Sequence, residues 1–176
     1  MTHRHSNIVL IGMPGSGKST VGIILAKLTS RDFLDTDILI QTTTGRTLQQ
    51  IVDGDGHMAL RRIEEDVLLS VSPKNQVIST GGSAPYSHAA MAHLQKDGIV
   101  VFLHADLKTL RRRIDNFETR GLAKKPEQSF EDLFEERLDL YSEYADITIE
   151  GGALTQEQVC RAIIAKLAAH HTKAHT

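Results

Sequence analysis

The stretch "IVLIGMPGSGKST", residues 8–20, decides the fold. It opens with a short apolar run that ends in glycine, which is typical of a strand buried on both faces in a parallel sheet. The segment that follows matches the pattern G-x-x-x-x-G-K-[ST] at Gly12, Gly17, Lys18 and Ser19. Apolar residues at helical spacing come next. A strand, a glycine-rich loop and a helix in this order predict a phosphate-binding loop.

Each part of this loop has a physical reason to hold a nucleoside triphosphate. The glycines let the backbone turn its N–H groups inward on a phosphate, and the helix N-terminus adds partial positive charge. We expect Lys18 to reach the β- and γ-phosphates and the Ser19 hydroxyl to ligate Mg²⁺. A plain glycine-rich turn is the alternative interpretation. The loop predicts a triphosphate donor and leaves the phosphoryl acceptor open.

The pattern continues outward as strands alternating with helices, which predicts a parallel α/β sheet. Further strands are expected in residues 31–37, 76–80, 98–104 and 146–150. Helices are expected in residues 18–28, 57–70, 89–94 and 130–141, around 107–114, and after the T-x-x-Q capping boxes at Thr47 and Thr155. The polar segment near 116–129 is expected to be a mobile loop.

Length and composition indicate one domain, residues 1–176. The net charge of −2 provides no overall basic field for nucleic acid or a membrane surface, and no apolar run approaches a membrane span. Cys160 is the only cysteine, so no disulfide within the chain and no cysteine-based zinc site is possible. We therefore expect a cytoplasmic protein without nucleic-acid or membrane partners.

Arg137 interrupts an apolar helix face in "FEDLFEERLDLY", residues 130–141. An arginine at that position loses hydration, and an unpaired buried charge costs several kcal/mol, so it needs an anion. The partner could be an internal Asp or Glu, or the side chain could extend to the edge of the helix. The functional alternative is a ligand carboxylate or phosphate held through two hydrogen bonds.

Asp35 and Asp37, in "FLDTD", follow the second strand at its carboxyl end, where ligands bind in open α/β sheets. If the segment is extended, the two carboxylates point to one side. Together they predict Mg²⁺ organisation and a base for a hydroxyl group. Helix capping by Asp37 is the alternative.

Other candidate positions also have structural alternatives. Arg61 lies at the rim of a helix face, where an exposed ion pair with Glu65 is one interpretation. Gly81 and Gly82 follow a strand and permit close backbone approach to a ligand, or form a mere turn. Arg120 lies in the polar loop and is a candidate for closing over the transferred group.

Together these pieces resemble the shikimate kinases over residues 8–149. "GMPGSGKSTVG" is similar to the family's phosphate loop, "FLDTD" to its F-x-D-x-D segment and "GHMALRRIEED" to its G-E-x-x-F-R-x-x-E helix. "ISTGG" resembles the start of its glycine triplet, "RGLA" falls where the family has R-P-L-L, and "ERLDLYSEYAD" resembles E-R-x-P-L-Y-x-x-x-A-D. The resemblance implies a three-layer α/β/α P-loop kinase with a five-stranded parallel sheet.

The resemblance also implies transfer of a phosphoryl group from MgATP to the 3-hydroxyl of shikimate. It further implies that the enzyme is a monomer. It implies catalytic roles for Lys18, Asp37 and Arg120, and a substrate site of Asp37, Arg61, Gly81, Gly82 and Arg137. The nucleotide would contact Gly12, Gly15, Ser16, Gly17, Lys18, Ser19, Thr20, Arg113 and Arg120, and Arg113 would lie along the adenine. Mg²⁺ would be held by Ser19 directly and by Asp35 through water.

Four departures from the family pattern bear on activity. Ser83 stands in place of the third glycine, and His57 and Leu60 replace Glu and Phe. Gly121 and Ala123 alter the R-P-L-L segment of the predicted mobile loop, which would act as a lid, and Asp139 replaces Pro. Two other functions therefore stay in view. One is a related kinase of another small acid or sugar, such as gluconate, and the other is a nucleotide-binding protein without turnover.

Overall fold

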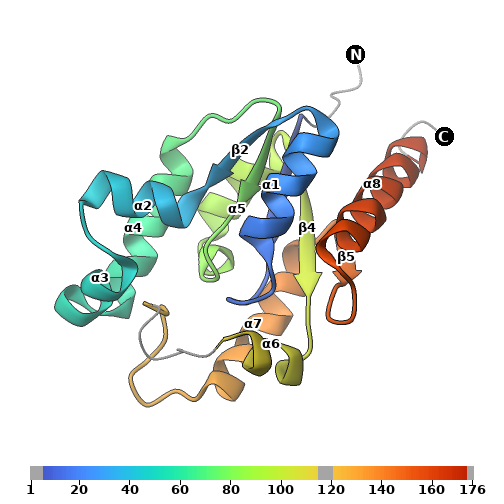
Figure 1. Ribbon diagram of the computed structural model, residues 1–176. Coiled ribbons are helices and arrows are strands. Elements are labelled where there is room, and N and C mark those ends of the chain that lie inside the picture. The colour runs from blue at the N-terminus through green and yellow to red at the C-terminus, as the bar shows by residue number, and fades with distance from the viewer. Residues whose placement is uncertain (1–5, 115–120, 174–176) are drawn as a thin grey trace.

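A computed structural model describes residues 6–114 and 121–173 (Figure 1). Five strands form one sheet with the order β2-β3-β1-β4-β5, and every neighbouring pair is parallel. The strands are β1 (Asn7–Ile11), β2 (Asp32–Asp35), β3 (Gln76–Ser79), β4 (Gly98–His104) and β5 (Ile147–Glu150). The predicted five-stranded parallel sheet is confirmed.

The helices occupy the connections between these strands, and the last helix follows the last strand. They are α1 (Lys18–Thr29), α2 (Thr36–Thr44), α3 (Leu48–Asp55), α4 (His57–Ser70), α5 (His88–Gln95), α6 (Leu107–Arg113), α7 (Phe130–Tyr144) and α8 (Gln156–Lys173), with one 3₁₀ turn, η1 (Ala84–Tyr86). All helices except α2 lie close to the ranges predicted from the sequence, whereas α2 was not among the expected helices and includes residues 36–37 of the predicted second strand. No helix in the described part of the chain is long and apolar enough to cross a membrane.

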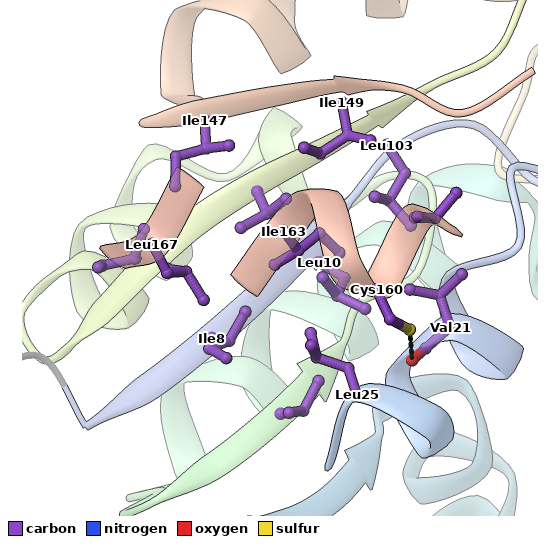
Figure 2. Close-up of a cluster of buried hydrophobic side chains, with 14 of the residues drawn as sticks. Ile8, Leu10, Val21, Leu25, Leu103, Ile147, Ile149, Cys160, Ile163 and Leu167 are labelled. Atoms are coloured by element: carbon purple, nitrogen blue, oxygen red, sulfur yellow. Dashed lines mark hydrogen bonds between the residues drawn. The ribbon is translucent and has the colours of Figure 1, made fainter. Parts of the chain in front are cut away.

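The central strand β1 is buried on both faces, which accounts for its continuous apolar sequence. Because side chains alternate along a strand, Ile8 and Leu10 join one core cluster, while Val9 and Ile11 join the other. The first cluster lies between the sheet and helices α1 and α8, and Figure 2 shows its side chains, including buried Cys160. The second lies between the sheet and α4, α5, α6 and α7. These layers confirm the three-layer α/β/α architecture.

Capping boxes set the start of three helices. Thr47 caps α3 together with Gln50, and Thr155 caps α8 together with Gln158, as the sequence predicted. Ser129 and Asp132 form the same device at the start of α7. Each cap satisfies backbone N–H groups that lack a partner inside the helix. The start of α7 is therefore fixed two turns before Arg137, which then falls on the buried face of the helix.

A third apolar cluster lies beside the sheet and packs α2, α3 and α4 against one another. Ala123 belongs to this cluster although it precedes α7 in the chain. The Gly121 N–H also donates to Gln49 Oε1 of α3 (2.6 Å). Figure 1 shows the chain from this point starting beneath α3 and α4 before it enters α7. The described part of the α6–α7 connection is thus attached to the helices that face the phosphate loop.

Candidate active site

A cavity of about 330 Å³ lies where the loops after β1, β2 and β3 meet. Carboxyl ends of parallel strands are where open α/β sheets bind ligands. The predicted residues that line it on the phosphate side are Gly15, Gly17, Lys18, Ser19 and Thr20. On the opposite side they are Asp37, Gly81, Gly82 and Arg137, with Arg113 at one end. The structure therefore brings these predicted residues together around one cavity.

Other predicted residues lie next to the cavity or outside the described residues. Gly12, Ser16 and Asp35 support the lining residues, and Arg61 lies behind the lining at Ala123. Arg120, predicted to close over the transferred group, lies outside the described residues, as do residues 116–119 of the predicted loop.

The phosphate loop ends at Gly17, which caps α1 with a positive φ of 97° and without a side-chain hydrogen bond. The first N–H groups of α1 consequently point toward the cavity without a side-chain acceptor, which suits an anion. Gly15 has a φ of 82°, and a Cβ there would overlap the Ile114 side chain. A side chain at that position would be strained and would also push α6 away from the loop.

Lys18 folds back over the loop and donates from Nζ to the carbonyls of Gly12 (2.7 Å) and Met13 (3.0 Å). Burial lowers its pKa to about 8, with Arg137 acting in the same direction and Asp37 opposing it. The Lys18 ammonium group is therefore buried, and its hydrogen-bond acceptors among the described residues are two carbonyl oxygens. An anionic ligand at the loop would stabilise its charge.

The two predicted metal-binding residues lie together. Ser19 Oγ donates to Asp35 Oδ2 (2.6 Å), while Asp35 Oδ1 accepts the N–H groups of Asp37 and Ile38. One hydroxyl and one carboxylate beside a phosphate loop fit Mg²⁺, which usually takes one or two protein oxygens and fills its shell with phosphate and water. Clusters of three or more His, Cys, Asp or Glu suited to a metal are absent from the described residues.

The local geometry of this segment corrects two expectations. Asp35, rather than Asp37, caps α2, and Asp37 lies in the first helical turn instead of on an extended segment. The carboxylates therefore separate: Asp35 turns to Ser19, and Asp37 lines the cavity. Both carboxylates lie at the site, as expected. They do so because Asp35 caps α2 and Asp37 lies in its first turn, and not because side chains alternate along a strand.

Gly81 makes room for two acidic side chains. A Cβ at Gly81 would overlap Glu64 Oε1 and lie 2.8 Å from Asp37 Oδ1. Glu64 is only 3% exposed; Ser83 Oγ donates to its Oε2, and its Oε1 has no hydrogen-bond partner among the described residues. Burial, reinforced by Asp37, raises the pKa of Glu64 to about 7. The Gly81 N–H itself donates to Thr36 Oγ1 (3.1 Å), so Gly81 serves the cavity mainly through the space it leaves.

Arg137 is 1% exposed, which excludes the interpretation that its charge reaches solvent. Its Nη2 donates to the Ala123 carbonyl (3.2 Å), and its Nε is buried without a hydrogen-bond partner. It forms no salt bridge with any described residue. A Cβ at Gly82 would lie 2.6 Å from Arg137 Nη1, so the bare backbone of Gly82 is what admits the guanidinium. Among the described residues no carboxylate pairs directly with Arg137 as the helix pattern had allowed, although the charge of Glu64 acts on it.

Arg61 meets the same carbonyl from α4. Its Nη2 donates to Ala123 O (3.1 Å), and its Nε is also buried without a partner. Its nearest carboxylate is Glu136 of α7, with Nη2 and Oε1 4.0 Å apart. The predicted ion pair with Glu65 does not occur, because the Arg61 side chain turns from the rim of α4 toward α7. Two arginines from different helices thus converge on one oxygen.

Arg113 was predicted to lie along the adenine. It is an exposed residue at the end of α6, it lines the cavity, and its Nη2 donates to the Gly152 carbonyl (3.3 Å). This contact places it between the phosphate loop and the turn that follows β5. The adenine contact itself remains a prediction.

Sequence reasoning missed three contributors to the site. Glu64 carried a usable signal, since a glutamate among Leu60, Val67 and Leu68 interrupts a buried helix face as Arg137 does. Ala123 and Tyr86 carried none, because a backbone carbonyl and a ring in a short turn follow no periodic pattern.

Comparison with known proteins identifies the family. A family profile described as shikimate kinase matches residues 14–168. A shikimate kinase from Thermodesulfovibrio yellowstonii is 37% identical over 161 residues, covering 90% of this chain and 92% of the relative. One from Sulfurihydrogenibium sp. is 36% identical over 162 residues, covering 92% and 97%.

Solved structures agree in fold. The shikimate kinase from Acinetobacter baumannii in complex with shikimate has a TM-score of 0.86 and 35% identity, and 93% of each chain is covered. A gluconokinase from Sinorhizobium meliloti has a TM-score of 0.54 at 18% identity over 98% of this chain and 97% of the gluconokinase, a likeness of fold alone. With the family profile and the curated relatives in agreement over nearly its whole length, the chain belongs to the shikimate kinase family.

Proposed function

We propose that the protein transfers the γ-phosphoryl group of ATP to the 3-hydroxyl of shikimate, giving shikimate 3-phosphate and ADP. One observation carries the acceptor half of this proposal: two arginines from α4 and α7 converge on the Ala123 carbonyl, and both Nε atoms are buried without partners. Buried donors of this kind are costly unless a ligand satisfies them. A planar carboxylate, with two oxygens and four lone-pair directions, suits a pair of guanidinium groups.

The donor half rests on the phosphate loop. Backbone N–H groups at the start of α1 and the Lys18 ammonium would offset the charge of the β- and γ-phosphates. Ser19 and Asp35 would hold Mg²⁺, which supplies charge neutralisation and orientation of the phosphates when it is bound. Arg113 would lie along the adenine, and Arg120 would complete the charge neutralisation from the lid.

The acceptor would lie between the loop and the arginines. Arg61 and Arg137 would orient its carboxylate in the position that the Ala123 carbonyl occupies here. Asp37 lines the cavity on the side of Lys18, where it would bind hydroxyl groups and accept the proton of the attacking one. Gly81 and Gly82 would let the substrate approach the backbone. Catalysis of such a transfer depends mainly on the positioning of the two substrates and on neutralisation of the charge on the transferred group.

The proposed assembly and location follow from simpler features. We propose a monomer of one domain that acts in the cytoplasm. The single cysteine, Cys160, is buried among apolar side chains, so the fold requires no disulfide and suits a reducing compartment.

The experiment is a coupled assay of ADP release from MgATP with shikimate, with gluconate and without acceptor. We expect turnover that depends on shikimate, with gluconate close to the background rate. Turnover with gluconate instead would move the protein to the related sugar-acid kinases. ATP hydrolysis that ignores shikimate, or no turnover with any acceptor, would overturn the proposal.

A further inference from the structure

Tyr86 lies between the two arginines, at the end of η1 and four residues after Gly82. The Arg61 Cζ atom lies 3.5 Å from the centre of the Tyr86 ring, and the Arg137 Cζ atom lies 5.4 Å from it. Both distances are within the range of a cation–π interaction, and the shorter one is a close stack. One ring therefore contacts the guanidinium groups of α4 and α7.

The hydroxyl of Tyr86 fixes the ring from its outer end. It donates to Glu136 Oε1 on α7, and Glu136 Oε2 accepts from Gln128 Nε2 (2.7 Å). The hydrogen bond from Tyr86 is the leading cause that lowers the pKa of Glu136, so this carboxylate is charged. Glu136 is also the carboxylate nearest to Arg61. The ring thus has one fixed orientation, with its face toward Arg61.

The Tyr86 ring offsets the repulsion between the two arginines. Arg61 and Arg137 carry like charges and share one carbonyl oxygen, and the charge of Arg137 adds to burial in lowering the pKa of Arg61. An internal carboxylate between them would remove the repulsion, but it would also use the in-plane N–H donors that a ligand needs. The face of an aromatic ring attracts a guanidinium from above its plane and leaves those donors available.

We propose that Tyr86 is a positioning residue for the acceptor's carboxylate, which holds Arg61 beside Arg137 with its in-plane Nε donor unused by any described residue and so favours planar carboxylates over uncharged groups. The proposal rests on the proposed function. It adds a residue for which neither the loop motif nor the helix patterns gave any signal.

The test compares Tyr86→Leu, which removes the ring, with Tyr86→Phe, which removes only the hydroxyl. We expect Tyr86→Leu to raise KM for shikimate about tenfold, the effect of a desolvated cation–π contact, with kcat and KM for ATP within about twofold. Tyr86→Phe should raise it less than about threefold, because the ring face remains. Tyr144→Leu, in the last turn of α7, is the matched tyrosine control and should leave all three constants unchanged.

A double-mutant cycle separates positioning from general packing. In an Arg61→Met background, Tyr86→Leu should change KM for shikimate by less than about twofold, since the side chain that it positions is gone. The methyl ester of shikimate provides a second measurement: Tyr86→Leu should reduce the preference for the acid over the ester. If Tyr86→Leu does not fold, Tyr86→Met, whose unbranched side chain of about the same volume adapts more easily to the gap, serves the same comparison.

Some outcomes would overturn the proposal. Equal effects of Tyr86→Leu in both backgrounds, an equal rise in KM for ATP, or an unchanged KM for shikimate would each show that the ring does not position Arg61. These results require that the unmodified protein phosphorylates shikimate. Absence of that turnover would overturn the proposed function, and the role of Tyr86 with it, so the two failures are distinguishable.

Discussion

The phosphate loop comes from one run of the chain, residues 12–20, whereas the acceptor side of the cavity combines α2, α4, the turn after β3 and α7. The loop presents mostly backbone groups whose positions follow from the glycines and from the start of α1. The acceptor side presents charged side chains, and each is held by a residue distant in sequence: Arg137 by Ala123, and Glu64 by Ser83.

The two regions also differ in how well their polar atoms are satisfied. At the loop, Lys18 donates to two carbonyl oxygens, and the buried side-chain atom without a hydrogen-bond partner among the described residues is the neutral Ser16 Oγ. On the acceptor side, three atoms of ionisable side chains are buried without such a partner: Nε of Arg61, Nε of Arg137 and Oε1 of Glu64. Unsatisfied buried groups cost free energy and mark places where a ligand completes the structure. The difference predicts that acceptor-side mutations trade stability against binding, whereas loop mutations affect chemistry alone.

The largest effect is expected for Lys18→Met. Loss of the ammonium removes a charge directed at the transferred group, so kcat should fall about 10³-fold or more. The fold should remain, because Lys18 makes only two hydrogen bonds, both within its own loop. Steady-state kinetics and a thermal melt measure the two quantities.

Lys27→Met is the matched control, since Lys27 is exposed at the far end of the same helix. It should leave kcat unchanged. A Lys18→Met protein that melts far below the unmodified one would show that the lysine is needed to build the loop, and it would erase the contrast between the two regions.

A smaller effect is expected for Arg137→Met, which should weaken shikimate binding without lowering the melting temperature. KM for shikimate should rise about 10²-fold, the typical cost of truncating one partner of a buried charged hydrogen bond, with KM for ATP nearly unchanged. The melting temperature should not fall, because methionine replaces a buried charge that forms no ion pair with any described residue. Kinetics for both substrates and a thermal melt in the absence of ligand test this.

The control for Arg137 is Arg161→Met on α8, an exposed arginine whose only ion pair, with Glu157, is 4.0 Å long. It should change neither constant. Loss of stability together with loss of ATP binding in Arg137→Met would make Arg137 a structural residue, and the acceptor side would then resemble an ordinary core.

The contrast between the regions also explains what the sequence could predict. Three features depend on residues close in sequence and were found where expected. They are the alternation of strands and helices, the loop motif, and the predicted capping boxes at Thr47 and Thr155. Arg137 was found because its charge breaks an apolar period. Its counterpart, the Ala123 carbonyl, was not, since it depends on how the segment before α7 packs on α4. The Arg61–Glu65 expectation failed because local spacing cannot reveal a competing partner that is distant in sequence, here the Ala123 carbonyl. The Asp37 expectation failed for a local reason, because Asp35 caps α2 and the helix already includes Asp37.

Glu64→Gln should stabilise the protein in a pH-dependent way. The pKa of Glu64 is raised from 4.5 to about 7, so the folded state holds its proton more tightly than the unfolded state. Stability therefore falls as pH rises from about 4.5 to about 7, and the full cost of the buried charge is present above 7. Removing that charge should raise the melting temperature at pH 8 by about 3–6 °C, and by much less at pH 5.

The measurement is a pair of thermal melts at pH 5 and pH 8 for the unmodified protein and Glu64→Gln. Glu65→Gln, at the next and more exposed position of α4, is the control and should shift both melts equally. Equal shifts for Glu64→Gln at the two pH values would mean that Glu64 does not titrate in this range, and the acidic part of the acceptor side would carry no strain.

The smallest effect is expected for Ser83→Gly, which restores a third glycine. Ser83 has an ordinary φ of −99°, so the change relieves no backbone strain, and its main effect is loss of the hydrogen bond to Glu64 Oε2. That hydrogen bond lowers the pKa of Glu64, so its removal should move the pH dependence of stability upward. KM for shikimate should change by less than about fivefold, as expected for one hydrogen bond to a charged group in a site with other contacts.

In a Glu64→Gln background the pH shift should vanish, because the titrating group is absent. A shift that persists there would mean that Ser83 acts on another group, and the acceptor side would then hold a second titrating residue coupled to it, with Asp37, on the other side of Gly81, as the first to examine.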